Sequence, residues 1–65
     1  MQTIQLLQDM QSCITEGKKT IPAGTIMHQH FTQLQWTYFK DSVGNTLIIM
    51  GFYSPDWNKV KIITQ

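Results

Sequence analysis

Apolar and polar residues alternate over short stretches of this chain, and turn-forming residues separate the stretches. Residues 34–40 alternate in the manner of a strand with one buried face. Residues 46–53 are rich in Ile, Phe and Tyr, and residues 41–45 between them carry Asp, Gly and Asn. We therefore predict an antiparallel hairpin in which residues 38–39 face residues 47–48.

The N-terminal stretch, residues 3–13, carries two patterns. Ile4 and Leu6 alternate with a polar residue, as in a strand, whereas Leu7, Met10 and Ile14 follow helical spacing. We favour a strand here, with a helix as the alternative. Residues 16–19 that follow are polar and contain glycine, which predicts a turn.

A second turn is predicted at residues 21–25, where a proline and a glycine lie two positions apart. This turn leads into a strand over residues 26–31, in which the alternation is imperfect. The inward face is either Met27 with Phe31 or Ile26 with His28, and we favour Met27 and Phe31.

The C-terminal third predicts a short helical turn followed by a last strand. Gly51 interrupts the second strand of the hairpin, which predicts a bulge or bend. Ser54 before Pro55 is typical of the start of a short helix. Residues 59–64 then alternate as a strand. We predict one mainly β domain over residues 1–65, with four or five antiparallel strands.

Composition supports a folded chain that lies outside the membrane. Of the 65 residues, 42% are hydrophobic and 14% are charged, which is too apolar for intrinsic disorder. The longest apolar run, residues 47–50, is far shorter than the roughly 20 residues that span a bilayer. Cys13 is the only cysteine, so no internal disulfide can form. We expect a cytoplasmic protein with no membrane association.

The order of the predicted elements resembles an SH3-like small barrel. The resemblance covers most of the chain and rests on a strand, a long polar excursion, residues 21–25 entering a second strand, a central hairpin, a helical turn and a last strand. The chain lacks the Ala-Leu-Tyr-Asp-Tyr stretch of eukaryotic peptide-binding SH3 domains. It is more similar to bacterial and phage barrels, which implies a subunit or adaptor that docks on a larger protein.

Candidate catalytic and metal-binding residues are few. His28 and His30 would lie on one face of a strand, but two imidazoles are too few for a metal site. Cys13 with a histidine would form a nucleophile and base only if an orienting group and a substrate pocket joined them. We expect no catalysis, no metal and no cofactor.

Aromatic residues are the strongest functional signal in the sequence. Seven Phe, Trp and Tyr residues exceed what so small a core can bury, so some should form an exposed patch. We expect the patch to contain Tyr53, Trp57 and one of Trp36 or Phe39. Such a surface is typical of a protein interface. We therefore predict a binding module that is an accessory or inhibitory partner of a larger protein, with an exposed strand edge able to pair with a second copy.

The alternative prediction is a small barrel that binds nucleic acid. In that interpretation Lys59 and Lys61 contact phosphates while Trp57 or Trp36 stacks on a base. The net charge of only +1 and the lack of arginine argue against it. The predicted binding residues for the two hypotheses together are Trp36, Tyr53, Trp57, Lys59 and Lys61.

Overall fold

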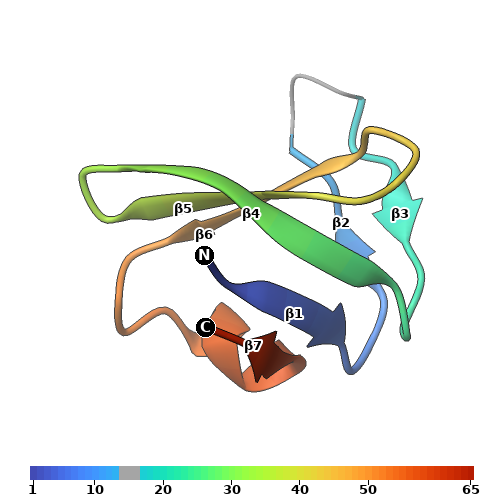
Figure 1. Cartoon of the computed structure of the whole chain (residues 1–65). Helices are drawn as coiled ribbons and strands as arrows, with labels where there is room; N and C mark the ends of the chain where they lie inside the picture. The colour runs from blue at the N-terminus through green and yellow to red at the C-terminus, as the bar shows by residue number, and fades with distance from the viewer. Residues whose placement is uncertain (14–16) are drawn as a thin grey trace.

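The computed structural model describes residues 1–13 and 17–65 and contains, in these ranges, seven short strands and one 3-10 helix (Figure 1). The elements in chain order are β1 Thr3–Leu6, β2 Met10–Gln11, β3 Thr20–Ile21, β4 Ile26–Gln33, β5 Trp36–Lys40, β6 Thr46–Met50, η2 Pro55–Lys59 and β7 Val60–Thr64. The mainly β fold and the helical turn before the last strand are therefore confirmed.

Five of the strands form one antiparallel sheet in the order β6-β5-β4-β1-β7, and β2 and β3 form a separate two-stranded sheet. Because Thr3 pairs with Thr64, the first and last strands of the chain lie side by side (Figure 1). Strands β6 and β7 are the outer strands, and no ladder joins them within the described residues. The antiparallel sheet is confirmed, whereas its closure into an SH3-like barrel stays a prediction.

The N-terminal stretch is strand and not helix, as favoured. It contains β1 and β2, separated by exposed residues that include Leu7. Of the polar turn predicted over residues 16–19, Gly17 and Lys18 have φ angles of 80° and 55°. These angles lie in the left-handed region typical of turns. Residue 16 lies outside the described residues.

The two predicted glycine turns are both present. In the first, the Thr25 amide donates to the Pro22 carbonyl over 3.3 Å, and Gly24 has a φ of 90°. This turn connects β3 to β4. In the second, Gly44 has a φ of 92° and its amide donates to the Asp41 carbonyl over 3.3 Å. A side chain at either glycine would be held in a backbone conformation that L residues disfavour.

The central hairpin has the predicted register. Tyr38 pairs with Ile48 and Phe39 with Leu47. The Asp41 carboxylate closes the turn by accepting hydrogen bonds from the Val43 and Asn45 amides, over 3.0 and 2.8 Å. This Asp-centred arrangement fixes the loop length and therefore the register of the two strands.

The favoured inward face of β4 is correct for Met27 and wrong for Phe31. Met27 is fully buried, but the Phe31 side chain is 43% exposed. A register shift between Gln29 and Phe31 interrupts the pairing of β4 with β5. One extra residue reverses the alternation beyond the shift, so Phe31 turns to the outer face. There its ring stacks on Tyr38, with centroids 4.2 Å apart.

Strand β5 begins two residues later than the alternation predicted. Leu34 and Gln35 form the turn between β4 and β5, and Leu34 has a positive φ of 58°. Within β5, Thr37 and Phe39 face inward while Trp36 is exposed. Of the two residues named for the aromatic patch, Phe39 therefore belongs to the core and Trp36 to the surface.

The core is mostly aliphatic and gathers side chains from all seven described strands. Its members share nearly complete burial: Ile4, Leu6, Met10, Ile21, Met27, Phe39, Leu47, Ile49 and Val60. Trp57 packs against this cluster from η2. No helix in the described ranges is long and apolar enough to span a membrane.

The segment after β6 follows the predicted sequence of a bend, a cap and a helical turn. Gly51 has a φ of 116° and ends the strand. The Ser54 hydroxyl accepts a hydrogen bond from the Asp56 amide over 3.2 Å, which caps η2 at its first turn. Val60, the first residue of β7, is buried. The bend and the helix together place Trp57 against the core.

Candidate functional site

Trp57 is held at two points of its indole ring. The Nε1–H group donates to the Gly51 carbonyl over 2.9 Å. The ring meets Phe39 edge to face, with centroids 6.1 Å apart and an interplanar angle of 82°. The side chain is half-buried. A large aromatic ring fixed in one orientation, with part of its surface open to solvent, is a suitable wall for a binding site.

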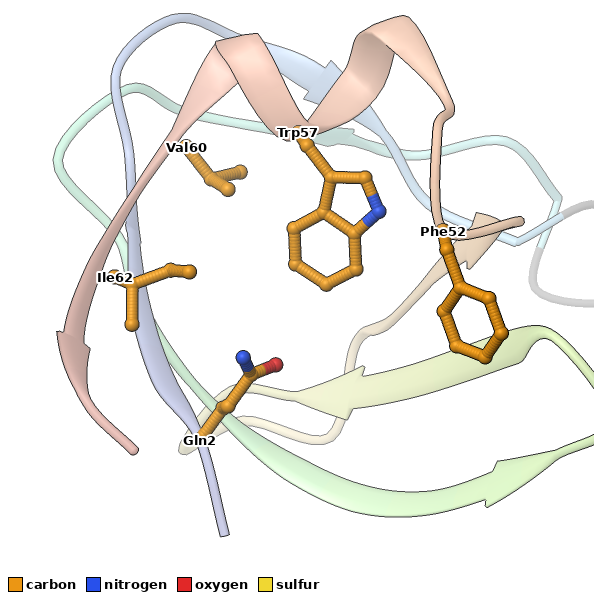
Figure 2. A pocket seen from close by; sticks show the side chains of 5 residues that line it. All are labelled: Gln2, Phe52, Trp57, Val60 and Ile62. Carbon is orange, nitrogen blue, oxygen red and sulfur yellow. The ribbon is translucent and has the colours of Figure 1, made fainter.

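That wall belongs to an open cleft of about 510 Å³, here named the Trp57 cleft (Figure 2). Its lining comes from the start of the chain, the bend after β6, η2 and β7: Gln2, Phe52, Trp57, Val60 and Ile62. The side chains of Trp57, Val60 and Ile62 point toward the centre of the cleft (Figure 2). The cleft is therefore apolar on most sides, and among the described residues that line it only Gln2 adds a polar side chain to the indole N–H.

Exposed apolar side chains continue beyond the cleft. Phe52 at its rim is 61% exposed, and Tyr53, the next residue, is 99% exposed. On the other side of Gly51, Met50 pairs across the sheet with Trp36, and both are exposed. The Gly51 amide donates to the Gln35 carbonyl over 3.0 Å, which ties this bend to the end of the β4–β5 hairpin. Exposed apolar residues thus lie on both sides of this hydrogen-bonded bend.

The two lysines named as binding residues differ in their surroundings. Lys59 Nζ lies 3.0 Å from Asp56 Oδ1 within η2, so its charge is compensated. Lys61 is exposed on β7 opposite Gln5 and has no ion-pair partner among the described residues. Of the two, only Lys61 offers an uncompensated charge to a ligand.

Known proteins supply no template for this site. No protein-family model, no curated protein and no solved structure matches the chain. The function is therefore inferred from the geometry of the Trp57 cleft and from the charges beside it.

The structure assembles residues that sequence analysis did not place in the site. Gln2, Phe52 and Ile62 line the Trp57 cleft together with the predicted Trp57, whereas Tyr53 does not line it. Ile62 lies on the same face of its strand as Val60, which the alternation of residues 59–64 had indicated. Nothing in the sequence pattern pairs this face with Gln2 or Phe52.

The carboxylates and imidazoles of the described residues are engaged in structural contacts. His28 Nδ1 lies 3.1 Å from the Thr3 hydroxyl. A smaller cleft of about 260 Å³ contains Asp9 and Asp56, but Asp9 accepts from the Ala23 amide over 2.8 Å and Asp56 pairs with Lys59. No group of three or more His, Cys, Asp or Glu side chains gathers within residues 1–13 and 17–65 in a way that could hold a metal ion.

Proposed function

We propose that this chain is a non-catalytic binding module that docks on a larger protein, as an accessory or inhibitory partner, through the Trp57 cleft. One observation carries the proposal: the indole of Trp57 is fixed by Gly51 and Phe39 as the wall of an open, mostly apolar cleft. A concave apolar surface with a preorganised aromatic ring is the usual setting of an interface anchor.

Energetic considerations favour Phe52 as the residue that contributes most to docking. Its ring is exposed at the rim of the cleft, so a partner can remove it from water without disturbing the core. Burying an exposed aromatic side chain contributes about 1.5–3 kcal/mol. Because Trp57 is already ordered, the partner does not have to offset the entropy of fixing that ring.

Capture of the partner with matched variants tests the proposal. The immobilised protein, Phe52→Ser and Val43→Ser are each incubated with an extract of the source cells, and retained proteins are identified by mass spectrometry. Val43 is an exposed apolar residue in the β5–β6 turn, away from the cleft lining. We expect one stoichiometric protein with the unmodified chain and Val43→Ser, and its loss with Phe52→Ser. Equal retention by all three proteins, or no retained protein, would contradict the proposal.

The alternative, a nucleic-acid-binding domain, has weaker support. Of the two lysines proposed to contact phosphates, only Lys61 has an uncompensated charge, because Lys59 is paired with Asp56. Trp57 is half-buried and packs against the core, which leaves less of its surface for a base. A titration with single-stranded oligonucleotide distinguishes the hypotheses. Binding that weakens steeply between low and moderate salt would favour nucleic acid, whereas docking through the Trp57 cleft should change little.

We further propose a cytoplasmic location, which the use of a single cysteine, Cys13, supports. Because the chain has one cysteine, Cys13 could form a disulfide only with a partner protein or with a second copy of the chain. Comparison of protein recovered with and without thiol alkylation during lysis tests this point. Recovery of a disulfide-linked form under alkylating conditions would contradict it.

A further inference from the structure

Strand β7 presents an open edge beside the Trp57 cleft. Its ladder partner is β1, and within the described residues no strand pairs with its other side. The other outer strand, β6, differs because the Cys13 amide donates to the Thr46 carbonyl over 2.8 Å at its first residue. The β7 edge is therefore the more accessible of the two outer edges of the sheet.

The direction of the β7 backbone groups follows from one hydrogen bond. The Leu7 amide donates to the Lys59 carbonyl over 2.8 Å, so this carbonyl, one residue before β7, points toward β1. In an antiparallel ladder successive residues point their backbone groups to opposite sides. Lys61 therefore faces β1, and the N–H and C=O groups of Ile62 face the open edge. The Ile62 side chain meanwhile lines the Trp57 cleft.

We propose that an extended peptide segment of the partner adds to β7 as a further strand, with an apolar side chain in the Trp57 cleft and a carboxylate beside Lys61. The proposal rests on the function proposed above and specifies the partner's chemistry. The backbone of the added strand bonds to the N–H and C=O groups of Ile62, as in other cases of strand addition to a sheet edge.

The alternating chemistry of the peptide follows from the alternation of β7. Lys61 and Ile62 are neighbours, so their side chains lie on opposite faces of the sheet. Side chains of an added strand meet their cross-strand neighbours on the same face. A peptide residue next to Ile62 therefore enters the cleft, and the adjacent residue lies next to Lys61. The matching sequence alternates apolar and acidic residues.

Charge favours such a peptide over a second copy of this chain. Lys61 has no ion-pair partner among the described residues, and the nearby Asp56 is already paired with Lys59. An acidic side chain would therefore gain an uncompensated partner at Lys61. In a symmetric β7–β7 pairing centred on Ile62, the two Lys61 side chains would be diagonal neighbours of like charge. Edge lysines of this kind disfavour pairing between identical edges.

The test uses a synthetic heptapeptide of alternating glutamate and leucine, titrated into the ¹⁵N-labelled protein and followed by NMR. We expect saturable binding, with the largest shifts at the Ile62 amide and the Trp57 indole N–H. Amide exchange at Ile62 should slow by about tenfold or more when the peptide is saturating. A peptide with the same composition, but with the glutamates and leucines in separate blocks, should bind more weakly. N-methylation of the edge-facing peptide amides should abolish binding, because it removes the donors of the ladder.

A charge reversal locates the acidic contact. Lys61→Glu should lower the affinity of the protein for the glutamate-leucine peptide by about fivefold or more. The same variant should bind a lysine-leucine peptide more tightly than the unmodified protein does. Lys40→Glu is the matched control, because it changes the net charge equally at an exposed position on β5. It should leave both affinities nearly unchanged.

Four results would overturn strand addition at β7. They are no saturable binding up to about 1 mM peptide, equal binding of the N-methylated peptide, equal effects of Lys61→Glu and Lys40→Glu, and a dimer in sedimentation with the Ile62 amide protected in the absence of peptide. The last result would assign the edge to a second copy. If partner capture still depends on Phe52 while the peptide fails these tests, the Trp57 cleft remains a docking site and only strand addition is wrong. If capture does not depend on Phe52, the proposed function itself fails.

Discussion

Substitution of Trp57 separates the two contributions of its indole to stability. Trp57→Phe keeps an aromatic ring against Phe39 but removes the Nε1–H donor that bonds to the Gly51 carbonyl. The net value of one such hydrogen bond is about 1 kcal/mol. Trp57→Ala removes the ring as well. Removing a buried Trp or Phe side chain costs about 3–5 kcal/mol, and the half-buried position of Trp57 places its cost near the lower end, at about 3 kcal/mol.

These costs are large relative to the stability expected for the whole domain. At about 0.05–0.15 kcal/mol per residue, a chain of 65 residues is stable by about 3–10 kcal/mol. In a domain of this size, 1 kcal/mol corresponds to about 4–8 °C in Tm. We therefore expect Trp57→Phe to lower Tm by about 4–8 °C. Trp57→Ala should lower Tm by about 12 °C or more and leave a measurable fraction of the molecules unfolded at room temperature.

Thermal unfolding followed by circular dichroism measures both variants, with Tyr53→Ala as the control. Tyr53 is almost completely exposed, so its removal should change stability by less than about 0.5 kcal/mol. A Trp57→Ala variant that melts within about 5 °C of the unmodified protein would refute the role of Trp57 in the core. Because Trp57→Ala is expected to destabilise the fold, loss of a partner in that variant would not identify an interface. Phe52→Ser is the appropriate variant for that purpose.

Three further predictions concern the turns. Gly44→Val should destabilise the domain by about 1–3 kcal/mol in thermal melts, because the backbone φ of 92° is strained for a residue with a side chain. No atom lies within 4 Å of the added Cβ, so steric clash does not contribute to this cost. An unchanged Tm would show that this turn is wrongly described. Ser54→Ala should cost about 1 kcal/mol by removing the acceptor for the Asp56 amide, and urea unfolding will measure it. Desolvation raises the pKa of Asp41, but hydrogen bonds from Asn45 and from backbone amides outweigh it and hold the pKa below its ordinary value of 3.8. The ionised Asp41 carboxylate therefore stabilises the folded state above its ordinary pKa, and this stabilisation is lost as the pH falls through the lower pKa of the folded state. Because Asp41→Asn has no carboxylate to protonate, its Tm should drop less than that of the unmodified protein between about pH 4 and pH 2.

The elements that sequence analysis predicted correctly depend on local chemistry. Gly44 and Gly24 lie where the backbone requires a positive φ, and Ser54 caps the helix that follows it. Each of these requirements involves residues only a few positions apart. The register of the central hairpin followed from its turn, because the loop length determines which residues face each other. Local chemistry was sufficient for this part of the fold.

The elements that were missed depend on long-range pairing or carry no turn signal. The register shift in β4 appears only in its pairing with β5, so the burial of Phe31 could not be inferred from its own strand. Leu34 adopts a positive φ without being Gly, Asn or Asp, the residues that normally indicate such a turn. The Asp56–Lys59 pair was missed because sequence analysis assigned Lys59 to the last strand, whereas in the structure Lys59 is the final residue of η2, three positions after Asp56.

The candidate site combines both kinds of information. Trp57 was predicted from the aromatic surplus, but its cleft requires Gln2, Phe52 and Ile62, which lie at the two ends of the chain and in the bend between β6 and η2. These residues are far apart in the sequence and come together only in the folded sheet, in which β1 and β7 are neighbours. Position in the sheet, and not residue type, therefore determines which apolar residues share the cleft.

The distribution of aromatic rings explains why the Trp57 cleft is the stronger of two candidate surfaces. The described core contains one fully buried aromatic residue, Phe39, so most rings lie at least partly on the surface. On the outer face of β4 and β5, Phe31 and Tyr38 stack on each other at 4.2 Å and cover one face of each ring. A ring that already has a stacking partner gains less from a ligand. Phe52 makes no ring contact of this kind within the described residues, and it stands at the rim of a concave site that an incoming side chain can fill. We therefore expect a larger gain in binding free energy at the Trp57 cleft than on the outer face of β4 and β5.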